Sequence, residues 1–249
     1  MNVYLLGTAG ARYVVAKQLR ASAGTVLEED GVFLLLDPGP GTLVHLAKHK
    51  IPVEKIRNIL ISHKHLDHSA DLNVIVDAIT EGAFKNRGRL FIPKEAWDEG
   101  VLLSYLREAL AETISLVEKE AYQTAKFSFK TTKKLLHSAE TYGFIFNLKD
   151  GKSLGFLVDT AFFEELISEF QGVNYLIVNV VRYEPKEGVL HLSVQDVRNL
   201  LASLRPELTV ITHFGMTMLR ANPFKVAKDL SAELNLKVVA AYDGLRLTL

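Results

Sequence analysis

The chain has 249 residues, of which 48% are hydrophobic and 23% charged, as is typical of a folded globular protein. Lysine plus arginine and aspartate plus glutamate each number 29, so the net charge is zero and a long nucleic-acid footprint, which usually needs a basic excess, is not favoured. The absence of cysteine excludes disulfides and thiolate metal sites, which leaves histidine, carboxylate and backbone oxygen as metal ligands.

The N-terminal third of the chain predicts short strands separated by turns. Apolar runs at 3–6, 24–28 and 32–36 are typical of strands, and a helix over 43–50 and a buried strand over 56–62 follow. Residues 1–7 lack the basic leader of a signal peptide, and every apolar run is too short to span a bilayer. We therefore expect a cytoplasmic protein with no membrane partner.

The rest of the chain predicts alternating helices and strands. Apolar residues at helical spacing predict helices over 70–83 and 102–118, with a strand at 89–92 between them. Beyond these we expect strands at 127–134, 142–148, 154–158, 175–180, 208–211 and 237–240, and helices at 162–170, 193–204 and 223–234. Because no linker or repeat interrupts this order, the simplest prediction is one α/β domain spanning 1–249, with sheets inside and helices outside.

A histidine-rich segment follows the buried strand at 56–62. It contains His63, His65, Asp67 and His68, and loops at strand ends commonly carry active sites. Imidazole and carboxylate suit zinc, iron or manganese. His63 and His65 alternate, so an extended turn can direct both toward one metal, while Asp67 and His68 can turn toward a second. The alternative is an exposed polar loop that happens to be rich in histidine.

Three further polar residues lie beside apolar strands. His137 precedes a strand, and Asp159 and His213 each end one. Taken alone, such a histidine is more often a hydrogen-bonded structural residue, and Asp159 precedes a predicted helix that it could cap. As a set with the histidine-rich segment, however, the three residues indicate additional metal ligands.

The pattern His-x-His-x-Asp-His, followed by these three residues, resembles the metallo-β-lactamase superfamily over nearly the whole chain. Segments 7–10 and 37–41 stand where that family has an early glycine loop and an Asp-x-Gly turn. The resemblance implies a four-layer αββα sandwich with two divalent metal ions at one edge, Zn²⁺ by default and Mn²⁺ or Fe otherwise. It implies that the first ion is held by His63, His65 and His137, the second by Asp67, His68 and His213, and both by a bridging Asp159.

His191 narrows the resemblance to the ribonuclease Z and cyclic phosphodiesterase branch. A histidine ahead of the last helix assists phosphate chemistry there, and Arg20-Ala21-Ser22-Ala23 is also similar to that branch. We therefore expect Asp67 and His191 to be catalytic: Asp67 would orient the nucleophile, and His191 would stabilise developing charge or protonate the leaving group. The alternative is that His191 only begins a helix. Ser69–Asn73 replaces the branch's glycine-rich segment and no tRNA-gripping arm is present, so the match to tRNA processing is weaker.

These features predict a dinuclear metal-dependent hydrolase. The leading interpretation is a phosphodiesterase that acts on a small nucleotide, a cyclic phosphate or an RNA end. The alternatives are a thioester, ester or lactam hydrolase on the same fold, and a relative that binds metal or ligand without turnover. Relatives of this kind often dimerise, which makes a homodimer an open expectation. The lysine-rich segment 126–134 could hold a phosphate or simply be a solvated strand face, and His45 and His49 are expected to be surface histidines.

Overall fold

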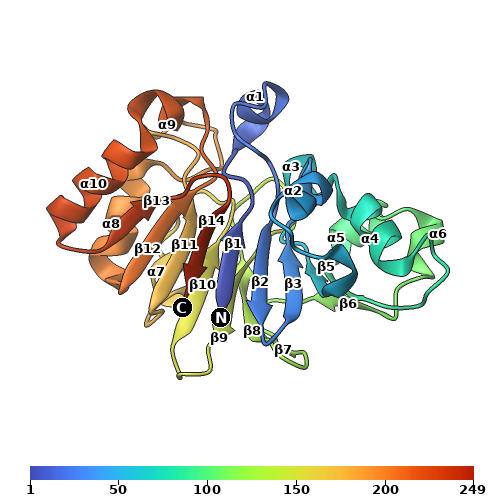
Figure 1. Cartoon of the computed structure of the whole chain (residues 1–249). Coiled ribbons are helices and arrows are strands. Elements are labelled where there is room, and N and C mark those ends of the chain that lie inside the picture. Colours follow the sequence, from blue (N-terminus) through green and yellow to red (C-terminus); the bar gives the residue numbers. More distant parts are fainter.

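Two seven-stranded sheets lie face to face at the centre of the molecule, with helices on their outer faces (Figure 1). The computed structural model describes residues 1–249. In spatial order, the first sheet consists of β14 (Leu245–Thr248), β1 (Asn2–Leu5), β2 (Thr25–Glu29), β3 (Val32–Leu36), β4 (Ile56–Leu60), β5 (Arg89–Pro93) and β6 (Glu112–Leu116). The second consists of β13 (Val238–Ala240), β12 (Leu208–Thr212), β11 (Tyr175–Asn179), β10 (Ser153–Leu157), β9 (Tyr142–Asn147), β8 (Ser128–Lys134) and β7 (Ala121–Gln123).

Most of the helices are short. They are α1 (Ala11–Ala16), α2 (Thr42–Lys48), α3 (Leu66–Ser69), α4 (Leu72–Thr80), α5 (Lys94–Asp98), α6 (Ser104–Arg107), α7 (Glu165–Glu169), α8 (Val194–Leu204), α9 (Met216–Ala221), α10 (Pro223–Leu234) and the 3₁₀ turn η1 (Val53–Lys55). No helix is both long and apolar enough to cross a membrane.

Three apolar cores define four layers. The middle core lies between the sheets and contains Phe91 of β5 together with Phe129, Phe144 and Phe156 of the second sheet. A second core joins the second sheet to α7, α8 and α10, and a third joins the first sheet to α2 and α4. Burying both faces of each sheet removes the most apolar area from water. The predicted αββα sandwich is therefore confirmed.

Parallel strands place several loops at one end of this sandwich. β3 to β6 run parallel in the first sheet, and β10 to β13 run parallel in the second. The carboxyl ends of parallel strands share an edge, where α/β proteins usually bind ligands. The histidine-rich segment follows β4, Asp159 follows β10 and His213 follows β12, so they meet at the end where α3 lies (Figure 1).

The helix predicted over 102–118 is wrong. Only α6 is helical there, and β6 occupies Glu112–Leu116 as a parallel partner of β5. Thr113 and Ile114 are β-branched and suit a strand, and pairing with β5 satisfies their backbone groups. Leu102, Leu106 and Leu110 are nevertheless buried in one core, which explains the helix-like spacing of apolar residues.

Candidate metal centre

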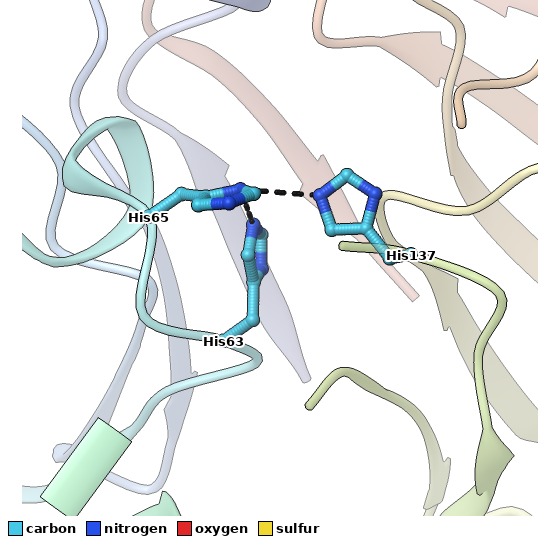
Figure 2. A group of neighbouring side chains, drawn as sticks. All are labelled: His63, His65 and His137. Atoms are coloured by element: carbon cyan, nitrogen blue, oxygen red, sulfur yellow. Dashed lines mark hydrogen bonds between the residues drawn. The ribbon is translucent and has the colours of Figure 1, made fainter. Parts of the chain in front are cut away.

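Three histidines from the two sheets converge on one point (Figure 2). His63 and His65 lie in the loop after β4, and His137 lies in the loop between β8 and β9. His65 Nδ1 is 3.0 Å from His63 Nε2 and 3.1 Å from His137 Nε2. Nitrogen ligands about 2.0–2.1 Å from a tetrahedral zinc ion stand roughly 3.3 Å apart. These rings would therefore need to open by only a few tenths of an ångström to hold one ion.

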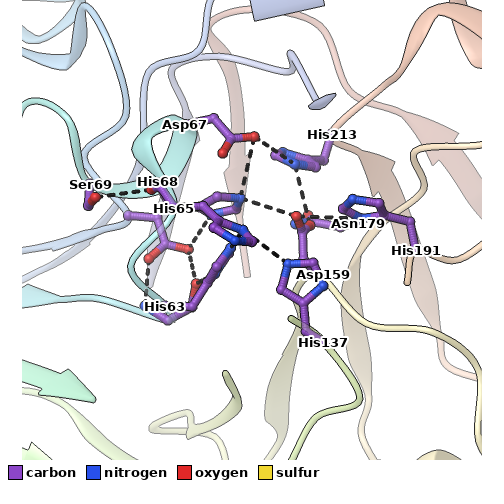
Figure 3. A network of polar contacts seen from close by, with 12 residues as sticks. His63, His65, Asp67, His68, Ser69, His137, Asp159, Asn179, His191 and His213 are labelled. Atoms are coloured by element: carbon purple, nitrogen blue, oxygen red, sulfur yellow. Dashed lines mark hydrogen bonds and ion pairs between the residues drawn. The ribbon is translucent and has the colours of Figure 1, made fainter. Parts of the chain in front are cut away.

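A second group lies beside the first (Figure 3). It comprises Asp67, His68, Asp159 and His213, whose candidate ligand atoms all lie within 4.8 Å of one another. Asp159 is 3.3 Å from His213 Nε2 and 3.4 Å from His68 Nε2, through its Oδ1 and Oδ2 respectively. Both Nε2 atoms are buried and make no hydrogen bond. Unpaired nitrogens facing ionised carboxylates fit a divalent cation, so the donors present suit the predicted metals.

Asp37 orients one histidine in each group. Its Oδ2 accepts a hydrogen bond from Ser62 Oγ at 2.6 Å and from His68 Nδ1 at 2.9 Å. Ser62 Oγ also lies 2.9 Å from His63 Nδ1. These contacts place the ring protons of His63 and His68 on Nδ1 and leave each Nε2 free to bind metal. The sequence marked Asp37 only as part of the Asp-x-Gly turn, since its contact with His68 depends on the tertiary structure.

Two other contacts orient the remaining ligands. His137 Nδ1 donates to the carbonyl of Leu190 at 3.0 Å, which directs its Nε2 toward His65. Asn179, at the end of β11, donates from Nδ2 to Asp159 Oδ1 at 2.8 Å. Partners of this kind fix the ring tautomer and carboxylate orientation of metal ligands. Sequence reasoning missed Asn179, although its place at a strand end is the signal shared by Asp159 and His213.

Protonation differs between the two groups. Burial lowers the pKa of His63 well below its usual value, and it also lowers the pKa of His65 and His137, which keeps these rings neutral. Burial acts on His68 in the same direction, but Asp159, Asp67 and Asp37 raise the pKa of His68 well above its usual value. The first group is therefore already in the neutral form that binds metal, whereas His68 must release a proton.

Two glycines permit the close approach of loops at this centre. A Cβ atom on Gly10 would lie 2.1 Å from the carbonyl oxygen of His213. On Gly39 it would lie 2.1 Å from the carbonyl oxygen of Asp67 and 2.2 Å from that of Ser22. His213 itself has a φ of 60°, an uncommon backbone conformation for a residue with a side chain. The early glycine loop and the Asp-x-Gly turn thus pack directly against segments that carry the candidate ligands.

The catalytic candidates lie at the same place. Asp67 Oδ2 is 3.7 Å from His213 Nε2, and His191 Nδ1 is 3.6 Å from Asp159 Oδ2. The His191 side chain is 20% exposed and its ring centroid is 5.2 Å from that of His137. Burial lowers the pKa of His191, and the charge of Asp159 partly offsets this effect. The structure therefore brings all eight residues predicted for the site to one end of the sandwich.

Two weaker sequence signals lie outside the centre. Within the lysine-rich segment, Lys126 pairs with Asp30 at 2.9 Å and Lys133 pairs with Glu165 at 3.1 Å, so both charges are satisfied by the protein. The rings of His45 and His49 stack with centroids 6.2 Å apart, and both residues are half-buried. Both keep part of their surface exposed, as expected of surface histidines, and His49 packs close to the C-terminal loop at Gly244.

Asp37→Asn is expected to weaken metal binding by about 10–100-fold, the usual effect of losing a partner that orients a ligand. The amide presents an N–H group toward His68 or Ser62, where the carboxylate accepts from both. The measurement is competition for Zn²⁺ with a chelator of known affinity. Asp71→Asn is the control, because Asp71 accepts hydrogen bonds from the amides of Gly41 and Leu43 instead. Equal affinities in Asp37→Asn and the parent chain would contradict the assignment.

Comparison with known proteins places this centre in a family. Residues 33–214 match the model of the beta-lactamase superfamily domain. The uncharacterized protein MJ1374 of Methanocaldococcus jannaschii is 31% identical over 260 residues, covering 100% of this chain and 95% of that protein. A ribonuclease Z of Borreliella burgdorferi is 24% identical over 275 residues, covering 86% and 85% of the two chains. The metallo-beta-lactamase fold protein YhfI of Bacillus subtilis superposes with a TM-score of 0.83 at 18% identity, covering 99% and 98%. The chain therefore belongs to the metallo-β-lactamase superfamily, on its ribonuclease Z branch, and is a metal-dependent hydrolase.

Proposed function

We propose that this chain is a two-metal phosphodiesterase acting on a small phosphodiester such as a nucleotide or a cyclic phosphate. The observation that carries the proposal is the pair of adjacent ligand groups, the second of which contains Asp159 with His191 3.6 Å from it (Figure 3). The relatives that align over most of the chain and carry the name ribonuclease Z support cleavage of a phosphodiester bond.

Each candidate ligand has a role in this proposal. His63, His65 and His137 would hold the first ion, Asp67, His68 and His213 would hold the second, and Asp159 would serve both. Imidazole and carboxylate donors without thiolate suit Zn²⁺, with Mn²⁺ or Fe as the alternatives. Two such ions, when bound, make water a nucleophile at neutral pH and stabilise both the attacking and the leaving oxygen.

The catalytic side chains act on opposite sides of the phosphorus atom. Asp67 orients the attacking water and accepts its proton as the new P–O bond forms. His191 faces Asp159 with Nδ1, which leaves its other ring nitrogen for the substrate. From that position it donates a hydrogen bond to the leaving oxygen and stabilises the charge that develops as the old P–O bond breaks, and the proton that this oxygen finally takes comes from the solvent. Water and a phosphodiester thereby become a phosphomonoester and an alcohol.

Charge favours a small substrate over a long RNA. The net charge is zero, and Lys126 and Lys133 in the lysine-rich segment are paired with carboxylates. Each phosphate contact along an RNA would need an available cation, and those contacts supply much of the affinity for nucleic acid. A homodimer and a cytoplasmic location stay predictions.

Hydrolysis assays on protein of known metal content test the proposal. We expect two metal ions per chain and turnover of bis(p-nitrophenyl) phosphate, with little turnover of a thioester or a β-lactam. Removal of metal with a chelator should abolish turnover, and added Zn²⁺ or Mn²⁺ should restore it. Two ions with turnover of only the thioester or the lactam would replace the phosphodiesterase proposal with a carbonyl hydrolase on the same fold.

A further inference from the structure

Lys64 lies between His63 and His65 in the sequence, and its side chain binds helix α5. Its Nζ donates to Glu95 Oε1 at 2.9 Å and to Glu99 Oε1 at 2.5 Å. The Lys64 side chain is only 23% exposed, so these contacts are partly shielded from water. Helix α5 therefore holds the loop that carries two histidines of the first group.

Helix α5 is also joined to the loop that carries the third histidine. The amide of Glu95 donates to Glu140 Oε2 at 2.7 Å, and the amide of Glu140 donates to Glu95 Oε2 at 2.5 Å. Glu140 thus accepts one of the unpaired amides at the beginning of α5, where a negative charge is also favourable. The hydroxyl of buried Tyr142 donates to Glu140 Oε1 at 2.7 Å and holds this carboxylate in place.

The contacts between α5 and Glu140 join the two sheets, as the first histidine group also does, and the loop between β8 and β9 takes part in both. Helix α5 follows β5 of the first sheet, whereas Glu140 lies between β8 and β9 of the second. The segment 135–141, which contains both His137 and Glu140, is closed by a backbone hydrogen bond from Leu135 to Thr141 at 2.9 Å. A shift of Glu140 would therefore move His137 relative to His65.

We propose that Lys64, Glu95 and Glu140 form a clamp that sets the separation of His137 from His63 and His65, and thereby the metal affinity of that group. The three are positioning residues, and none belongs to the candidate ligands. The inference rests on the proposed metal centre, in which those histidines hold the first ion. Charged hydrogen bonds are stronger and more directional than neutral ones, which suits a device that fixes a distance.

The test is metal binding by Glu140→Ala and Lys64→Met in the full-length chain. We expect one of the two ions to bind about 10–100-fold more weakly and the other to be unchanged. Affinities are measured by competition of Zn²⁺ with a chelator. Substitution with Co²⁺ identifies the weakened site, because the absorption spectrum of the ion that remains should match that of His137→Ala. Lys94→Met is the matched control, since Lys94 pairs with Asp98 on the same helix and donates no side-chain hydrogen bond to Glu95 or Glu140.

The possible results distinguish a failure of the clamp proposal from a failure of the proposed two-metal function. Equal weakening of both ions, or a lower melting temperature with both affinities unchanged, would overturn the clamp and leave Lys64 and Glu140 as structural residues. If Glu140→Ala does not fold, Lys64→Met decides the point, because it leaves the Glu95–Glu140 pair intact. A parent chain that binds fewer than two ions would refute the two-metal function itself, before any variant is compared.

Discussion

Asp159→Asn is expected to lose at least one metal ion per chain and to lower phosphodiester turnover by roughly a thousandfold. Asp159 is buried and lies within 3.4 Å of a histidine nitrogen through each of its carboxylate oxygens. Burial raises the pKa of Asp159, but its contacts with the His213 and His68 side chains lower it, so that the pKa lies well below the usual value. An amide of the same shape removes the negative charge that would bridge two cations. Losing several kcal/mol of charge stabilisation in the transition state corresponds to about that loss of rate.

The measurement combines metal analysis with turnover of bis(p-nitrophenyl) phosphate. Asp71→Asn is the control, because Asp71 is a nearby aspartate whose oxygens accept backbone amides at the beginning of α2. It should retain both ions and most of the activity. If Asp159→Asn keeps two ions and parent-like turnover, Asp159 is a structural residue and the bridging role is wrong.

His191→Ala is expected to lower kcat by about 10²–10⁴-fold with the metal content unchanged, which is the usual contribution of a positioned acid or hydrogen-bond donor. His191 touches the edge of the centre, at 3.6 Å from Asp159, but it is not among the side chains that converge as candidate ligands. The loss should be larger for an ester with an alkoxide leaving group than for one that releases p-nitrophenolate, because the poorer leaving group depends more on a donor.

Comparing kcat for the two esters in the parent chain and in His191→Ala measures this difference. His49→Ala serves as the control, since His49 directly follows the end of α2 and its ring stacks on His45. A loss of metal in His191→Ala would mean that His191 is a ligand. A uniform loss for both esters would assign it to substrate binding or structure instead.

Much of the fold was predictable because its strands and helices have clear local patterns. The strand at Val32–Leu36 and the helix at Pro223–Leu234 have the predicted bounds, and the 142–158 hairpin is present as β9 and β10. Prediction failed where local spacing and tertiary pairing disagree. The leucines before β6 repeat at helical spacing, yet pairing with β5 makes Glu112–Leu116 a strand. Helices of a single turn or two, such as α1, α5 and α9, are too short for periodicity to reveal.

The sequence by itself determined the residue types of the centre and their places at strand ends. His63, Asp159 and His213 each follow an apolar strand, and polar residues at such ends have a local signature that needs no tertiary information. The order of strands and helices likewise determined the layered architecture, since each apolar face must be buried against another.

Only the tertiary structure decided which of these ends meet and what orients them. His137, from a loop of the second sheet, contacts His65, from a loop of the first. Asp37 accepts hydrogen bonds from both Ser62 and His68, and Glu140 accepts one from the first turn of α5. Such contacts join residues far apart in the sequence and depend on strand register and loop path. Hydrophobic periodicity contains no information about either. The spacing of residues in a chain indicates which face of a helix or strand a side chain occupies. A hydrogen bond requires in addition that the tertiary structure bring a donor atom and an acceptor atom to about 3 Å from each other.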